Sequence, residues 1–374
     1  MSAANWYELQ SSSQLLSPCL LVYPDIIRRN ISASIRIAGG QKRLRPHVKT
    51  HKTSQIVKLA MEQGITKHKC ATLSEAAMLA ACGVPDVLLA YPLVGPAIAK
   101  FAELVKQFSQ TQFRCVADDN EALSQLHDEF GRRKIVVDVL LDIDTGMHRT
   151  GIESGDAALE LYIRLTQLPN VTAGGFHVYD GQNHQPSLAD RQHAVSELLK
   201  PVRAMVAELA QRGINVPRLV CGGTPTFPVF ASLADEIIEC SPGTCVLSDF
   251  NYGRDYADIS GIAHAAVLFS RVISRFGPNR LTLDLGYKAV ASDQPAGRRC
   301  HFLNIPDAQE VGHSEEHLVI ETKHAGQFKP GDAVYALPAH VCPTVALHSH
   351  LQVVKHGEVV DSWLVDARDR FYRL

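Results

Sequence analysis

Short apolar segments alternate with longer amphipathic segments over residues 44–245. Eight short segments have the length and residue types of strands, and between them apolar residues recur at helical spacing. The strand segments are 44–50, 68–72, 87–91, 113–118, 136–143, 171–179, 218–221 and 237–241, and the helical segments include 53–63, 74–81, 95–108, 120–130 and 188–211. Eight strands alternating with helices predict a parallel (β/α)8 TIM-type barrel in the α/β class, with an open doubly wound sheet as the alternative.

The pattern changes after about residue 262. Long helical segments stop, and strand-like runs follow one another between Gly, Pro, Asp and His residues. These runs are 265–276, 280–285, 318–321, 333–336, 351–354 and 362–365. We therefore predict an N-terminal segment over residues 1–20 that could join the second domain, a barrel over 21–255 and a C-terminal β-rich domain over 256–374.

Length and composition narrow the class of protein. The 374 residues are 46% hydrophobic and 20% charged, which is enough apolar material for a large core and excludes disorder. Basic and acidic residues number 37 and 39, and the resulting net charge of -2 argues against nucleic acid as a partner. The nine cysteines are an odd number without regular spacing, so they indicate reduced thiols and a cytoplasmic location rather than a disulfide framework.

No segment has the pattern of a signal peptide or a membrane span. Residues 1–8 lack both a basic region and an apolar region. The most apolar stretch, residues 78–94, is interrupted by Gly83, Pro85, Asp86 and Pro92, whereas a span needs about 20 nearly unbroken apolar residues. We expect no membrane contact.

The densest polar cluster, residues 45–52, ends the first predicted strand. In an extended strand Arg45, His47, Lys49 and His51 share one face, and in a parallel barrel the ends of the strands open on the active site. A lysine in such a mouth, beside other cations, is a usable amine nucleophile. A solvated basic edge strand is the alternative.

Two glycine-containing loops follow the seventh and eighth predicted strands. They contribute the small and hydroxyl residues Gly222, Gly223 and Thr224, and Gly243 and Thr244. Barrels often bind phosphate in these two loops, although either loop alone is more often a simple turn. Together with a lysine after the first strand they predict an amine and a phosphate cradle, the combination that pyridoxal 5′-phosphate requires.

Two further strand ends suit the same cofactor. Arg149 lies in the segment after the fifth strand and could reach an oxygen or the ring nitrogen of the cofactor, with a structural Arg–Asp pair as the alternative. His177 and Tyr179 share a face at the end of the sixth strand and could stack on the ring, although a lone aromatic residue there is more often part of the core.

A metal site is indicated near the C-terminus by His340 and Cys342. On an extended chain these two side chains point the same way, and imidazole with thiolate suits a borderline-soft ion such as zinc. Two protein ligands are too few for a closed structural site, so positions would stay open for water or a substrate oxygen. A buried histidine beside a buried free cysteine is the alternative.

Taken together, these segments resemble the D-threonine aldolase and D-serine dehydratase family, which has the alanine racemase-type fold. The resemblance covers nearly the whole chain and is most specific in residues 45–52, 144–151, 221–226, 242–244 and 340–342. It implies a barrel that binds pyridoxal 5′-phosphate, a C-terminal β domain, a homodimer and a divalent metal, zinc or manganese, beside the cofactor.

The resemblance also implies a role for each candidate residue. Lys49 would form the Schiff base, and Arg149, His177 and Tyr179 would surround the cofactor ring. The phosphate would lie against Gly222, Gly223, Thr224, Gly243 and Thr244. His340 and Cys342 would bind the metal, so that the implied catalytic residues are Lys49, His340 and Cys342.

The implied function is a lyase that acts on a small-molecule substrate, a D-3-hydroxy amino acid. Retro-aldol cleavage would release glycine and an aldehyde, whereas β-elimination would release a 2-oxo acid and ammonia. The His-x-Cys pair resembles the dehydratase branch slightly more. An amino-acid racemase, which needs a second acid/base group and no metal, and a non-catalytic pyridoxal-phosphate-binding protein are the alternatives.

Overall fold

The computed structural model describes residues 5–370. Residues 1–4, part of the segment expected to contain no signal peptide, and residues 371–374, the end of the predicted β-rich domain, lie outside the described residues. The chain divides into two compact units. The barrel unit contains residues 34–49 and 57–243, and the β unit contains the residues up to 33 together with 50–56 and 244–368.

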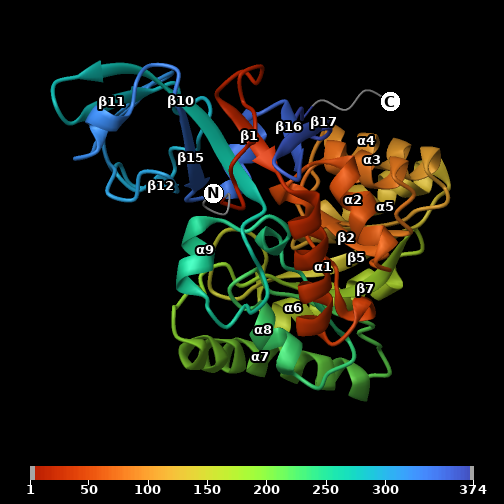
Figure 1. Ribbon diagram of the computed structural model, residues 1–374. Coiled ribbons are helices and arrows are strands. Elements are labelled where there is room, and N and C mark those ends of the chain that lie inside the picture. Colours follow the sequence, from red (N-terminus) through yellow and green to blue (C-terminus); the bar gives the residue numbers. More distant parts are fainter. Residues whose placement is uncertain (1–4, 371–374) are drawn as a thin grey trace. The chain divides into compact units, whose positions relative to one another are not determined.

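Most helices belong to the first 255 residues and alternate with strands (Figure 1). They are α1 (Pro24–Ala38), α2 (Ser54–Glu62), α3 (Leu73–Ala81), α4 (Pro96–Gln107), α5 (Asn120–Arg133), α6 (Asp156–Gln167), α7 (Leu188–Gln211), α8 (Phe227–Ser232) and α9 (Phe250–Asp255), and α10 (Val341–Leu347) follows in the β unit. Short 3-10 turns are η1 (Gln41–Arg43), η2 (Val48–Thr50), η3 (Thr244–Val246) and η4 (Ala325–Gln327). Within residues 5–370, no helix combines the length and the apolar character needed to cross a membrane.

The barrel unit is built on a parallel sheet of order β2-β3-β4-β5-β7-β8-β9, with a short β6 on β5. Its strands are β2 (Lys67–Cys70), β3 (Asp86–Leu89), β4 (Gln112–Ala117), β5 (Val137–Asp144), β6 (Ile152–Glu153), β7 (Val171–Val178), β8 (Leu219–Cys221) and β9 (Ile238–Cys240). The two ends of this sheet are joined through residues 44–47, because Leu44 bridges Cys240 and His47 bridges Lys69. The sheet therefore closes, which confirms the predicted barrel over the open doubly wound sheet.

The β unit holds a mostly antiparallel sheet of order β13-β14-β11-β10-β1-β16-β17, with β15 on β10 and β12 on β15. Its strands are β1 (Cys19–Val22), β10 (Ala266–Phe276), β11 (Arg280–Leu283), β12 (Cys300–Phe302), β13 (Gln309–His313), β14 (Leu318–Glu321), β15 (Ala333–Pro338), β16 (His350–Lys355) and β17 (Glu358–Leu364). The N-terminal strand β1 pairs antiparallel with β10 and parallel with β16. A strand-rich C-terminal domain is thus confirmed.

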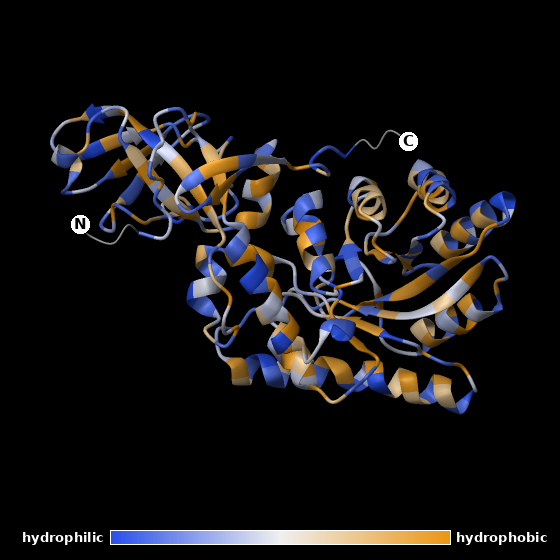
Figure 2. Ribbon diagram, turned by 45° about the vertical axis from the view of Figure 1, so that its right-hand side comes forward, coloured by the Kyte–Doolittle hydropathy of each residue, from blue (hydrophilic) through white to orange (hydrophobic). Residues whose placement is uncertain are grey.

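The interior of the barrel is layered. Leu88, Val116, Leu140 and Val220 come from four different strands and form a buried hydrophobic cluster. Figure 2 shows hydrophobic residues along the barrel strands and both kinds of residue along the helices around them. This is the pattern expected when strands are buried on both faces and helices on one.

Arg45 lies in a buried ionic layer of the same interior and is fully buried. Its Nε lies 2.6 Å from Glu239 Oε2 and its Nη1 lies 2.7 Å from Asp86 Oδ1. The expectation that Arg45 shares one face with Lys49 and His51 is wrong, because the 3-10 turn η2 begins at Val48 and ends the alternation of the strand.

We expect Arg45→Met to lower the free energy of unfolding by about 2 kcal/mol, because the substitution removes the cation that Asp86 and Glu239 share and leaves them only Arg114 and Lys67. The shift of the urea midpoint measures this change. Lys200→Met is the control, since it removes an exposed ion pair with Glu197 that contributes less than about 1 kcal/mol. Equal midpoints for the two variants would contradict a structural role of Arg45.

The same ionic layer predicts acid sensitivity. Burial raises the pKa of the Asp86 and Glu239 carboxyls, but Arg45, together with Arg114 at Asp86 and Lys67 at Glu239, outweighs burial and holds both pKa values below their usual range. Carboxyls with a lowered folded-state pKa stabilise the fold above about pH 4, and this stabilisation is lost as the pH falls further. Urea midpoints measured from neutral to acidic pH should therefore fall more steeply for the wild type than for Arg45→Met.

Candidate active site

Three cationic side chains flank one half-buried aromatic ring, that of Tyr179 at the end of β7. Arg149 Cζ lies 5.1 Å, Lys69 Nζ 5.6 Å and Lys49 Nζ 5.8 Å from the centroid of the ring. Lys49 follows the closing segment 44–47, Lys69 belongs to β2 and Arg149 follows β5. The closed barrel therefore brings the three side chains together. Cations around an aromatic ring suit an anionic ligand that itself has a ring.

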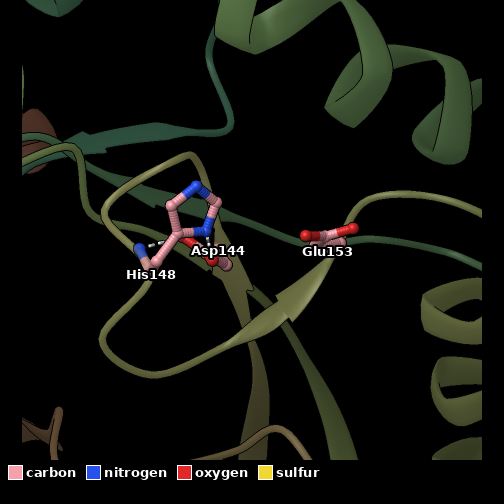
Figure 3. Close-up of side chains that lie close together, drawn as sticks. All are labelled: Asp144, His148 and Glu153. Carbon is pink, nitrogen blue, oxygen red and sulfur yellow. Dashed lines mark hydrogen bonds and ion pairs between the residues drawn. The ribbon is translucent and has the colours of Figure 1, made fainter.

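The loop that carries Arg149 is shaped by Asp144 at the end of β5. One oxygen of the Asp144 carboxylate accepts the backbone N–H groups of Gly146, Met147 and His148 at 2.9–3.1 Å, and the other lies 2.9 Å from His148 Nδ1 (Figure 3). Glu153 is also near, and one ligand atom from each of Asp144, His148 and Glu153 lies within 4.8 Å of the others. Because the Asp144 oxygens already accept hydrogen bonds from the loop, we assign this cluster to the conformation of the loop that presents Arg149.

The two predicted phosphate loops meet beside Tyr179. Gly243 N–H donates to Thr224 Oγ1 at 3.2 Å and joins the loop after β9 to the loop after β8. A Cβ atom on Gly223 would lie 3.3 Å from the ring of Tyr179, and one on Gly222, whose φ is +76°, would lie 2.8 Å from Phe230. A side chain at Gly222 would clash with Phe230, and one at Gly223 would press on the Tyr179 ring, so the two glycines leave room for backbone N–H groups beside that ring. Such a cradle fits a phosphorylated ring compound.

The imidazole of His177 contacts a carboxylate with one ring nitrogen and an amine with the other. His177 Nδ1 lies 2.6 Å from Asp142 Oδ1, and its Nε2 lies 3.4 Å from Lys69 Nζ. All three side chains are buried. Both ring nitrogens of His177 thus have polar partners, and its predicted stacking on a cofactor stays a prediction. Lys69 was not among the residues predicted from the sequence. The signal in Lys67–Cys70 is that lysine occupies alternate positions of the strand, Lys67 and Lys69.

The predicted metal ligands lie together in the β unit. His340 has an extended backbone, but helix α10 begins at the next residue, so the expected extended run through Cys342 is wrong. The two side chains nevertheless form a hydrogen bond. Burial lowers the pKa of His340, but Cys342 and Asp293 outweigh burial and raise it to about 9.

Asp293 is a member of this site that the sequence did not reveal. Its Oδ2 lies 2.5 Å from His340 Nδ1, and a carboxylate behind a histidine is the usual outer partner of a metal-binding imidazole. Thr344 fixes the geometry, because its hydroxyl donates to His340 O at 2.8 Å and accepts Ala291 N–H at 3.2 Å. A nitrogen and a sulfur ligand with a carboxylate behind the nitrogen fit a zinc-type ion.

Cys342 also contacts two threonine hydroxyl groups of the β unit. Its Sγ lies 3.2 Å from Thr50 Oγ1 and 3.6 Å from Thr244 Oγ1. Both threonines belong to the same unit as Cys342, so these contacts hold the thiol in place within that unit.

Known proteins resemble this chain over nearly its full length. The chain is 29% identical over 370 residues to 3-hydroxy-D-aspartate aldolase of Paracoccus denitrificans (strain Pd 1222), covering 96% of this chain and 94% of the relative. It is 25% identical over 372 residues to D-threo-3-hydroxyaspartate dehydratase of Delftia sp. (strain HT23), covering 93% and 96%. The crystal structure of D-threonine aldolase from Filomicrobium marinum has the same fold, with a TM-score of 0.86, 24% identity and 95% coverage of both chains.

Two family models match successive parts of the chain. The putative serine dehydratase domain matches residues 265–354, which include His340 and Cys342. The alanine racemase N-terminal domain matches residues 22–247, which include the whole barrel sheet and every candidate cofactor residue. Because this second match spans more than half of the 374 residues, the chain belongs to the family of the alanine racemase N-terminal domain.

Proposed function

We propose that this protein is a lyase that uses pyridoxal 5′-phosphate and a divalent metal to cleave or dehydrate D-3-hydroxy amino acids. One observation carries the proposal: the closed barrel gathers an amine, an arginine and a glycine cradle around the Tyr179 ring. The relatives named as aldolases and dehydratases of 3-hydroxy amino acids support the substrate class. The homodimer and the cytoplasmic location stay predictions.

Each cofactor-site residue has one task in this proposal. When bound, pyridoxal 5′-phosphate supplies an aldehyde for an amine and a ring that withdraws electrons from the substrate's α-carbon. Lys49 would hold the aldehyde carbon, and Arg149 would bind an oxygen or the ring nitrogen. Tyr179 would pack on the ring, while Gly222, Gly223, Thr224, Gly243 and Thr244 would hold the phosphate.

The metal ligands would act on the hydroxyl group of the substrate. A zinc or manganese ion on His340 and Cys342 would supply Lewis acidity to the 3-hydroxyl. Asp293 keeps the imidazole of His340 oriented through Nδ1, which leaves Nε2 as the nitrogen that would bind the metal. Removal of the hydroxyl proton would lead to cleavage of the Cα–Cβ bond. Alternatively the Lys49 amine, free once the substrate amine has taken its place, would accept the α-proton, and the 3-hydroxyl would leave.

A product assay with D-threonine, D-serine and D-3-hydroxyaspartate tests the proposal. Glycine with an aldehyde identifies an aldolase, and ammonia with a 2-oxo acid identifies a dehydratase, and either result supports the lyase. Formation of the L-enantiomer would instead identify a racemase. No turnover of any of these substrates by protein loaded with cofactor and metal would favour a binding protein.

A further inference from the structure

A second amine lies in the interior of the barrel. Lys69, in the middle of β2, is only 2% exposed. Its Nζ lies 3.4 Å from Nε2 of His177 in β7, a strand that does not neighbour β2 in the sheet. The Lys69 side chain therefore points across the interior of the barrel, toward the same Tyr179 ring that Lys49 approaches.

The carboxylates that face Lys69 are held by other groups. Asp142 in β5 is bound by His177 Nδ1 at 2.6 Å and by the hydroxyl of Thr150 at 3.0 Å. Asp180, after β7, accepts the hydroxyl of Thr226 at 2.9 Å and lies 3.3 Å from Asn183 Nδ2. Neither carboxylate is placed as a dedicated partner for the ammonium form of Lys69.

The other groups around Lys69, which are His177, Cys221, Lys49 and Arg149, do not provide a negative charge. Burial lowers the pKa of His177, which favours the neutral imidazole, and a neutral ring that donates from Nδ1 to Asp142 would accept at Nε2. Burial raises the pKa of the Cys221 thiol in β8 well above its usual value. Lys49 and Arg149 are cations near the same ring. The ammonium form of Lys69 thus meets two cations and one imidazole acceptor, opposed by the carboxylates of Asp142 and Asp180, each of which also binds other groups.

Near neutral pH we therefore expect both the ammonium and the neutral amine form of Lys69 to be populated. Burial and the neighbouring Lys49 lower the pKa of Lys69 to about 7, against the attraction of Asp142, Cys221 and Asp180. An anionic ligand beside the Tyr179 ring would favour the ammonium form, because an opposite charge within about 6 Å raises the pKa of a lysine. A proton from solvent would then bind to Lys69 Nζ when the ligand binds.

We propose that Lys69 is a further cofactor-binding residue, a cation that becomes fully charged when an anionic phosphorylated pyridine binds at Tyr179. The inference rests on the proposed function, in which Lys49 holds the aldehyde carbon and leaves Arg149 and Lys69 to balance the charge of the ligand. His177 and Asp142 position Lys69 by accepting one of its N–H groups through the imidazole.

Pyridoxine 5′-phosphate is the probe that tests this role, because it carries the ring and the phosphate but no aldehyde that could react with Lys49. Calorimetric titration in two buffers of different ionisation enthalpy measures the protons taken up on binding. At pH 7 we expect the wild type to take up a measurable fraction of a proton, since a lysine whose pKa is lowered toward neutrality is only partly protonated beforehand. Its affinity should weaken as the pH rises above 7.

Three variants separate Lys69 from its neighbours. Lys69→Met should bind the probe about tenfold more weakly, as loss of about one pKa unit of interaction implies, and should take up no proton. Lys67→Met, on the same strand but paired with Glu239, should keep the uptake. Asp180→Asn should also keep it, although burial raises the pKa of Asp180 to about 7.

Two results would overturn the proposal: a wild type that binds the probe without proton uptake, or uptake that survives in Lys69→Met and disappears in Asp180→Asn. The wild-type measurement needs no variant, so the test holds even if Lys69→Met does not fold. Failure of the proposed function has a different signature, because the wild type would then bind neither pyridoxine 5′-phosphate nor pyridoxal 5′-phosphate.

Discussion

Replacement of Lys49 by alanine should lower kcat by about 10⁴-fold or more, the size of effect seen when a covalent catalytic group is removed. Of the two amines beside Tyr179, Lys49 is half-buried and therefore the more accessible to an aldehyde, whereas Lys69 is buried and hydrogen-bonded to His177. We expect Lys49 to carry the covalent link to the cofactor aldehyde and Lys69 to remain unmodified.

Borohydride reduction of the loaded protein followed by peptide mapping distinguishes the two amines. The mass of the reduced cofactor should appear on the peptide that contains Lys49 in the wild type and in Lys69→Met, and it should be absent in Lys49→Ala. Lys100→Met, a change at an exposed lysine, controls for loss of a positive charge. A label on the peptide that contains Lys69 would show that Lys69, and not Lys49, forms the covalent link.

Loss of the metal should have the second largest effect. Only two protein ligands are proposed, so His340→Ala or Cys342→Ala should each abolish stoichiometric binding of zinc or manganese and reduce turnover by about 10²-fold or more. Asp293→Asn should be milder, with metal affinity about 10- to 100-fold lower, because Asp293 acts through the orientation of His340.

Elemental analysis and turnover, measured on the same samples, check this order of effects. Cys82→Ala is a matched control, since Cys82 is another partly exposed cysteine, at the end of α3, and should keep full metal content. Dialysis against a chelator should remove turnover while the absorbance of the bound cofactor persists. Full activity of metal-free protein would exclude the Lewis-acid role.

The barrel was predictable because its strands and helices have local patterns. The predicted segments 87–91 and 218–221 correspond to β3 (Asp86–Leu89) and β8 (Leu219–Cys221), and the predicted helix 188–211 has the bounds of α7. Strands buried on both faces are continuous apolar runs, and the helices between them keep a polar face, so both patterns are visible within a few residues of sequence.

The sequence also showed which residue types stand at the ends of the predicted strands, where barrels place their functional groups. Lys49, Arg149, Tyr179 and Gly223 were selected in this way, and the structure brings them together, while their role in cofactor binding stays a prediction. The sequence did not show that Arg45 and Lys49 have different roles, because both are basic residues of the same segment. Its role as the centre of a buried ionic layer depends on Asp86 and Glu239, which other strands supply.

The sequence by itself thus determined the order of strands and helices, the barrel with its β-rich second domain and the residue types at the strand ends. Only the tertiary structure decided which groups become partners: Lys69 meets His177 across 108 residues, and His340 meets Asp293 across 47. The physical reason is that periodicity depends on neighbouring residues, whereas burial and charge pairing depend on closure of the barrel and on packing within the β unit. Closure of the barrel buries Lys69 against His177, and packing within the β unit gives His340 its carboxylate.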